Sequence, residues 1–186
     1  QPDIVVISAA IHEGNPELAA ARAQGLPVLV RAELLGRLMA AHAGPRIAIA
    51  GTHGKTTTTS MAALCLEQAG LDPTALIGGE FAPFHGNARI GRGGLFVTEA
   101  CEAYGSFLSL EPDIAVITNI EPDHLDYYKT PERVADAFRR FAASTRPGGC
   151  LLACADDPGV RALLADAGAA RQGVRTVTYG LTSPDA

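Results

Sequence analysis

The sequence lacks the features that mark several classes of protein. None of its apolar runs approaches the roughly 18 residues of a membrane-spanning helix, so we expect no insertion into a membrane. Its first residues do not have the basic, apolar and small-residue order of a signal peptide. The net charge is −5 and no charge runs occur, which argues against nucleic acid or a polybasic membrane-binding surface as a partner.

Cysteine is also scarce, with four residues in 186 and no pair at the Cys-x-x-Cys spacing. A disulfide framework and a zinc site are therefore disfavoured, and a reducing compartment is expected. We expect the cysteines to be small core residues. Cys65 lies in an apolar helical pattern, and Cys150 and Cys154 flank an apolar strand.

The residues that are present are typical of a globular α/β protein. They are 47% hydrophobic and 19% charged, and the length suits one domain, or one domain and a fragment. Apolar runs bounded by turn residues predict strands over residues 3–8, 27–30, 47–50, 94–99, 114–118, 151–154 and 174–179. Helical patterns between them span residues 16–25, 32–43, 55–69, 131–144 and 158–168.

Strands that alternate with helices predict a parallel sheet with helices on both faces. The first run, residues 3–8, is continuously apolar from residue 4 to 7, as in a strand that is buried on both faces. The best domain boundary is the helix-breaking pair Gly44–Pro45. It divides the chain into residues 1–44, too few to hold a core alone, and residues 45–186.

The strongest functional signal is a glycine-rich turn between a strand and a helix. It runs through Gly51, Thr52, His53 and Gly54 to Lys55, Thr56 and Thr57. Backbone N–H groups at such a turn converge on one point, where the helix dipole favours an anion. The lysine can then reach the β- and γ-phosphates of a nucleotide, and the first threonine can offer its hydroxyl to Mg²⁺.

The usual phosphate-loop pattern has glycine where Ile49 stands, so the strict motif is not met. The alternative is a tight turn with a surface lysine. That alternative leaves four successive threonines at a helix start unexplained, because threonine is only a middling helix former.

Polar residues also follow other predicted strands, and ligands gather at the carboxyl ends of parallel strands. Glu99 ends one strand and either holds Mg²⁺ or is a solvated carboxylate. Asn119 ends another, and His124 follows it as a metal ligand, a phosphate contact or a structural histidine. Glu102 is either a second carboxylate near the metal or a surface residue.

Three motifs together resemble the Mur ligases, the ATP-dependent amide-forming enzymes of peptidoglycan precursor synthesis. They are Ala-Gly-Thr-His-Gly-Lys-Thr-Thr-Thr-Thr at 50–59, Glu-Ala-Cys-Glu at 99–102 with Ser-Phe-Leu at 106–108, and Thr-Asn-Ile-Glu-Pro-Asp-His-Leu-Asp-Tyr-Tyr at 118–128. They stand in the family's order, and the resemblance covers nearly the whole chain. His53 and the threonine run resemble the member that joins L-alanine to the lactyl carboxylate of UDP-N-acetylmuramate.

The resemblance implies a P-loop NTPase-type parallel sheet flanked by helices over residues 45–186, as the ATP-binding central domain. Residues 1–44 would be the C-terminal part of a Rossmann-like domain that binds the UDP-sugar. ATP and Mg²⁺ are the implied cofactors, and UDP-N-acetylmuramate and L-alanine the implied substrates. The implied reaction passes through an acyl phosphate in the bacterial cytoplasm.

The resemblance also assigns residues. The catalytic ones are Lys55, Glu99 and His124. Those that bind ATP are Gly51, Thr52, His53, Gly54, Lys55, Thr56, Thr57 and Asn119. One Mg²⁺ would be held by Thr56 and Glu99, and His124 would help to hold a second between the γ-phosphate and the substrate carboxylate. Contacts with the substrate are expected from Ser8, Ala10, Ile11, Asn87 and Arg89.

The sequence departs from the family at some positions. Cys101 stands where aspartate is frequent, and residues 103–105 lack an expected acidic residue. Family members have three domains, so we expect a partial chain that opens inside the first and stops before the second is complete. The alternatives are a ligase that recycles murein peptides, a nucleotide-binding module without catalysis, and a kinase-like or switch NTPase, which residues 121–126 disfavour.

Overall fold

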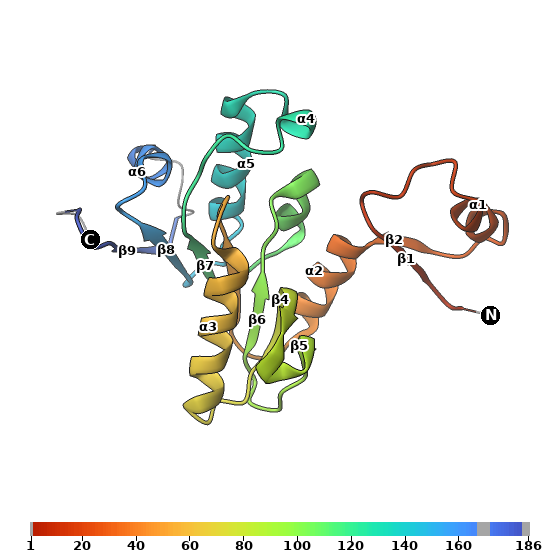
Figure 1. Cartoon of the computed structure of the whole chain (residues 1–186), viewed down its shortest axis with the longest axis horizontal. Coiled ribbons are helices and arrows are strands. Elements are labelled where there is room, and N and C mark those ends of the chain that lie inside the picture. The colour runs from red at the N-terminus through yellow and green to blue at the C-terminus, as the bar shows by residue number, and fades with distance from the viewer. Residues whose placement is uncertain (1, 167–171, 184–186) are drawn as a thin grey trace.

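The computed structural model describes residues 2–166 and 172–183 of the chain. Figure 1 shows a seven-stranded sheet with helices packed against it, and a smaller unit of two strands and a helix that lies to one side. The last helix ends at Ala165, and its predicted end at Gly168 falls outside the described residues.

The smaller unit comprises β1 (Val5–Ile7), α1 (Pro16–Ala23) and β2 (Val28–Val30), and α2 (Arg31–Ala41) leads from it to the large sheet. Asn15 caps α1, because its Oδ1 accepts from the Glu17 N–H at 2.9 Å. β1 and β2 pair in parallel. The prediction that the first strand is buried on both faces is wrong. One face is open, because Val5 and Ile7 are half-buried while Val6, which points to the opposite face, is 41% exposed.

The large sheet has the strand order β5-β4-β6-β3-β7-β8-β9. Its strands are β3 (Arg46–Ala50), β4 (Thr74–Phe81), β5 (Gly86–Arg89), β6 (Phe96–Glu99), β7 (Ile114–Ile117), β8 (Cys150–Cys154) and β9 (Arg175–Tyr179). All neighbours run parallel except β4 and β5, which are antiparallel. The predicted parallel sheet is confirmed. The central strand β3 lies between β6 and β7, so the loops that follow these three strands meet at one edge.

Two of the strands, β4 and β5, were not predicted. In β4 the apolar pattern is interrupted by Gly78 and Gly79, and β5 is a short strand whose single apolar side chain is that of Ala88. Pairing on both sides stabilises β4 despite its glycines. Leu76, for example, lies opposite Thr98 of β6 and Ala88 of β5.

Alternate residues of β3 face two cores. Ile49 packs with residues of α3 (Lys55–Gln68) on one face of the sheet. Ala48 and Ala50 face the other core, which is covered by α2, η2 (Ala103–Ser109), α5 (Pro131–Ala143) and α6 (Pro158–Ala165). Phe107 of η2 stacks there on Phe141 of α5, with ring centroids 5.0 Å apart. Helices therefore cover both faces, as predicted.

The cysteines do not all lie in these cores. Cys65 is exposed, and Cys101, Cys150 and Cys154 are half-buried free thiols. The prediction of core cysteines is therefore wrong for Cys65, which lies on the outer side of α3. No helix within residues 2–166 and 172–183 is long and apolar enough to cross a bilayer.

Candidate functional site

The site begins at the turn between β3 and α3. Gly51 has a φ of 147°, and a Cβ on it would lie only 1.9 Å from Thr118 Oγ1. Gly54 is the N-cap of α3 and has a φ of 79°. Both positions require glycine, which adopts positive φ without strain. The first N–H groups of α3 have no acceptor within the helix, and this leaves them available to an anion at the turn.

The end of β7 holds this turn in place. The side-chain amide of Asn119 forms two hydrogen bonds with the backbone of His53. Its Oδ1 accepts from the His53 N–H at 2.7 Å, and its Nδ2 donates to the His53 carbonyl at 2.9 Å. Thr118 Oγ1 donates to the same carbonyl at 2.9 Å. Thr52 Oγ1 accepts from the Glu121 N–H at 2.9 Å. Asn119, predicted to bind the nucleotide, therefore contacts the loop backbone with both ends of its side-chain amide.

Lys55 folds back over the turn. Its Nζ donates to the carbonyl oxygens of Gly51 at 2.7 Å and Thr52 at 3.0 Å. The same Nζ lies 3.0 and 2.8 Å from the two carboxylate oxygens of Glu102. The side chain of Lys55 is 12% exposed and that of Glu102 is 3% exposed. The nearly buried ion pair with Glu102 thus holds the Lys55 ammonium beside the backbone of the turn.

Glu99, the last residue of β6, receives two hydrogen bonds at one oxygen. Thr56 Oγ1 donates to Glu99 Oε2 at 2.8 Å, and the Gly78 N–H of β4 donates to the same atom at 2.8 Å. A Cβ on Gly78 would lie 2.2 Å from that oxygen, so the approach depends on glycine. The carboxylate is therefore oriented from two sides, by α3 and by β4.

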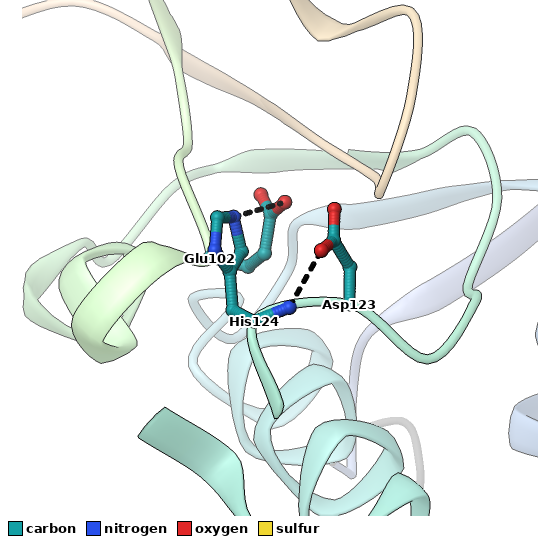
Figure 2. Close-up of side chains that lie close together, drawn as sticks. All are labelled: Glu102, Asp123 and His124. Carbon is teal, nitrogen blue, oxygen red and sulfur yellow. Dashed lines mark hydrogen bonds and ion pairs between the residues drawn. The ribbon is translucent and has the colours of Figure 1, made fainter. Parts of the chain in front are cut away.

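A second group of polar side chains comprises Glu102, Asp123 and His124 (Figure 2). Each places one ligand-type atom within 4.8 Å of the other two. His124 Nε2 lies 3.6 Å from Glu102 Oε1, and the His124 N–H donates to Asp123 Oδ1 at 2.6 Å. His124 has a φ of 51° and precedes α4 (Leu125–Tyr128). Such a left-handed conformation is uncommon outside glycine and clusters at functional sites.

Tyr128 supports the backbone of this group, since its hydroxyl donates to the Glu102 carbonyl. Burial raises the pKa of Tyr128 to about 12. The phenol therefore remains protonated at neutral pH and continues to donate this bond.

A cavity of about 280 Å³ adjoins Glu99, between α2 and the edge of the sheet. Leu34, Leu35 and Leu38 of α2 and Phe107 of η2 form part of its apolar wall. Its polar lining includes Glu99, Asn87 and Cys101. Burial raises the pKa of the Cys101 thiol, which keeps it protonated. The structure thus brings the predicted substrate residue Asn87 to the same cavity as Glu99.

Family models match the chain in two successive parts. The model of the Mur ligase middle domain matches residues 49–186. The chain belongs to the Mur ligase family. A second model, described as the catalytic domain of the Mur ligase family, matches residues 1–43.

Curated relatives of this Mur ligase chain include two UDP-N-acetylmuramate–L-alanine ligases. The protein from Pelotomaculum thermopropionicum is 54% identical over 184 residues, and the one from Saccharopolyspora erythraea is 53% identical over 180 residues. The matches cover 99% and 96% of this chain but only 38% and 36% of the relatives. The chain therefore spans less than two fifths of the length of these relatives.

Solved Mur ligase structures share its fold. The UDP-N-acetylmuramate–alanine ligase of Thermotoga maritima superposes with a TM-score of 0.81 at 29% identity, over 98% of this chain and 39% of that one. A UDP-N-acetylmuramate:L-alanyl-γ-D-glutamyl-meso-diaminopimelate ligase from Neisseria superposes with a TM-score of 0.80 at 28% identity. That match covers 94% of this chain and 58% of the other.

The donor atoms of this Mur ligase chain fit Mg²⁺. Thr56 and Glu99 place a hydroxyl and a carboxylate 2.8 Å apart at the phosphate turn, and Mg²⁺ prefers oxygen ligands beside substrate phosphates. His124 lies with Glu102 and Asp123, a group that does not include Glu99. Thr56 and Glu99, predicted for one Mg²⁺, and His124, predicted for a second, therefore lie in two separate groups of side chains.

The other predicted substrate residues lie elsewhere in the Mur ligase chain. Arg89 does not line the cavity. It forms an ion pair with Asp72 at 2.7 Å and donates to Glu67 at 3.1 Å, contacts that connect β5 to the turn before β4 and to the end of α3. Ser8, Ala10 and Ile11 form a turn after β1, in which the Ala10 N–H donates to Ser8 Oγ at 3.1 Å. The substrate roles of these four residues remain predictions.

Two site residues were missed or left open from the sequence. Gly78 was missed, because its contact with Glu99 depends on the unpredicted strand β4. Glu102 was left between a site carboxylate and a surface residue. The residue is only 2% exposed and forms an ion pair with Lys55, so the interpretation of Glu102 as a surface residue is excluded.

Proposed function

We propose that the chain is the ATP-binding part, with an adjoining piece of the UDP-sugar domain, of a ligase that joins L-alanine to UDP-N-acetylmuramate in the bacterial cytoplasm. One observation carries the proposal. At the N-terminus of α3, the Lys55 ammonium lies against the glycine-rich turn, and the Thr56 hydroxyl donates to the Glu99 carboxylate. The relatives at 54% and 53% identity bear the name of this reaction and support the choice of substrates.

In the proposed reaction the lactyl carboxylate attacks the γ-phosphorus of ATP, and the β–γ bridging oxygen leaves with ADP. The amine of L-alanine then attacks the carbonyl carbon of the acyl phosphate, phosphate leaves, and the amine loses a proton. The first step joins two anions, so the protein must neutralise charge and align the reactants. No nucleophilic side chain is required.

The residues of this chain divide the work. The N–H groups of the turn and the Lys55 ammonium bind the β- and γ-phosphates. Thr56 and Glu99 would hold one Mg²⁺, and His124 would help to hold a second. Bound Mg²⁺ supplies positive charge beside the phosphate oxygens. Asn119 and Thr118 keep the turn in shape through His53. Residues 1–44 and the cavity beside Glu99 are the parts proposed for the UDP-sugar side.

The test is made in the complete protein with Lys55→Ala. We expect no ADP release and no acyl hydroxamate when hydroxylamine is added to trap the acyl phosphate. Lys129→Ala is the matched control, because Lys129 is exposed and its Nζ donates to the backbone carbonyl of Asp126, outside the turn. ADP release at the normal rate in Lys55→Ala would refute the assignment.

A murein-peptide ligase is the second candidate, because the Neisseria structure fits this chain with a TM-score of 0.80. Acceptor competition separates the two candidates. We expect phosphate release with L-alanine and none with the tripeptide L-alanyl-γ-D-glutamyl-meso-diaminopimelate. The reverse preference would assign the chain to the recycling reaction, and no acyl hydroxamate with either acceptor would favour a non-catalytic nucleotide-binding module or a switch NTPase.

A further inference from the structure

The ion pair between Lys55 and Glu102 constrains how a phosphate reaches the lysine. A lysine ammonium has three N–H donors. In the structure these donors face three groups: the Gly51 carbonyl, the Thr52 carbonyl and the Glu102 carboxylate. A phosphate oxygen that bonds to Lys55 must therefore replace one of the three.

Glu102 is the acceptor that can be replaced with the least rearrangement. The two carbonyls belong to the turn, whose backbone is fixed by bonds to Asn119 and Thr118. Glu102 contributes only a side chain to the contact. When Lys55 moves to a phosphate, the backbone of the turn can keep its shape and the carboxylate loses its partner.

A carboxylate that is 3% exposed is costly to leave unpaired. Figure 2 shows that Glu102 points toward the His124 ring and that the Asp123 carboxylate lies beside them, next to the His124 backbone nitrogen. Two carboxylates and an imidazole nitrogen within 4.8 Å form a ligand set that suits a divalent cation. A cation held there can take the place of Lys55 as the partner of Glu102.

We propose that Glu102 exchanges partners, holding Lys55 until a nucleotide binds and then pairing with a divalent cation held with Asp123 and His124. Glu102 is thus a positioning residue that acts through Lys55 and makes phosphate binding conditional on the cation. Without a cation, its negative charge both retains the lysine and repels the phosphates. This inference rests on the nucleotide site of the proposed function.

The test measures the affinity of a non-hydrolysable ATP analogue by titration calorimetry, with excess Mg²⁺ or with EDTA, in the complete protein. Glu102→Gln keeps the shape of the side chain and removes its charge, and Glu102→Ala removes the charge with different packing. We expect affinity in EDTA to rise about tenfold or more in both variants, and the gain from Mg²⁺ to shrink by at least that factor.

Two controls separate charge from position. Glu111→Gln removes an exposed carboxylate two residues after η2, outside the turn and outside the group of Glu102, Asp123 and His124, and should leave both affinities unchanged. Glu102→Asp keeps the charge and should retain most of the gain from Mg²⁺.

The outcomes distinguish the two claims. If both uncharged variants keep the wild-type ratio of affinities with and without Mg²⁺, the exchange is wrong while the nucleotide site stands. Equal weakening in both buffers also overturns it, because it would show that Glu102 only supports the fold. If the wild type binds no analogue in either buffer, the proposed nucleotide site fails and the exchange fails with it.

Discussion

The contact between Gly78 and Glu99 yields the sharpest prediction of the structure. A Cβ at position 78 would lie 2.2 Å from Glu99 Oε2 and 2.6 Å from its Cδ. Ordinary van der Waals contact begins at 3.4 Å, so Gly78→Ala must displace the carboxylate by about 1.2 Å. This movement breaks the bond from the Gly78 N–H and misaligns the bond from Thr56.

The size of the effect follows from these bonds. A hydrogen bond to a charged group contributes about 1.5 kcal/mol or more, so the loss of both corresponds to roughly a 100-fold reduction in rate. A misplacement of about 1 Å at a reacting centre is expected to cost a similar factor. Overpacking destabilises folded proteins by about 1–3 kcal/mol, which a folded parallel sheet can tolerate.

Gly79→Ala is the matched control. It makes the same substitution one position further along β4, where the new Cβ meets Thr56 Cγ2 at an ordinary 3.6 Å. Its free energy of unfolding should stay within about 1 kcal/mol of the wild type.

Phosphate release by the complete protein, with UDP-N-acetylmuramate and L-alanine, is measured against Mg²⁺ concentration for both variants. Gly78→Ala should show about 100-fold lower activity and a higher Mg²⁺ requirement. Equal activity and equal Mg²⁺ requirement in the two variants would refute the positioning of Glu99 by β4.

Three further predictions follow. His124→Ala should raise the Mg²⁺ requirement, and an unchanged Mg²⁺ titration would remove this residue from the metal site. Phe138→Ala should lower the free energy of unfolding by about 3–5 kcal/mol in urea denaturation, because this ring is fully buried against Phe107; a loss below 1 kcal/mol would contradict that packing. The carboxylate of Asp156 accepts hydrogen bonds from the N–H groups of Leu181 and Thr182. These bonds, above all the one from Leu181, lower the pKa of Asp156 from 3.8 to about 2. The stability that its charge contributes should therefore be complete above about pH 4 and decline as the pH falls toward 2. The difference in stability between wild type and Asp156→Asn, measured by urea denaturation from pH 5 downward, should narrow over that range; a constant difference would contradict the shift.

Local sequence patterns predicted the parts of the fold that local physics determines. The predicted helix starts at residues 16 and 55 are confirmed as the first residues of α1 and α3, because the capping residues Asn15 and Gly54 are their neighbours in the chain. The antiparallel hairpin β4–β5 was missed. Its glycines have weak strand propensity, and the pairing that stabilises them involves strands distant in sequence.

The site shows the same division between local and long-range information. The anion-binding turn was predictable because its residues are consecutive. The partner of Lys55 was not, because Glu102 is 47 positions away and only the sheet brings the two together. Long-range contacts also position Arg89. Its guanidinium bonds to Glu67 and Asp72, partners that the local sequence did not indicate, and its predicted contact with the substrate stays a prediction.

The strand order explains why substitutions elsewhere in the sheet should affect the turn between β3 and α3. The turn follows β3, and the neighbouring strands supply the contacts that fix it. Thr118 and Asn119 directly follow β7, and Glu99 is the last residue of β6. β4 pairs with β6 and forms part of the cavity wall through Leu76, Ile77 and Gly78. Gly78 therefore touches both the cavity and the carboxylate proposed to hold Mg²⁺. A ligand that shifts β4 from the cavity side would move Glu99 through this single hydrogen bond, so occupancy of the cavity and cation affinity should be coupled. By linkage, the coupling must act equally in both directions.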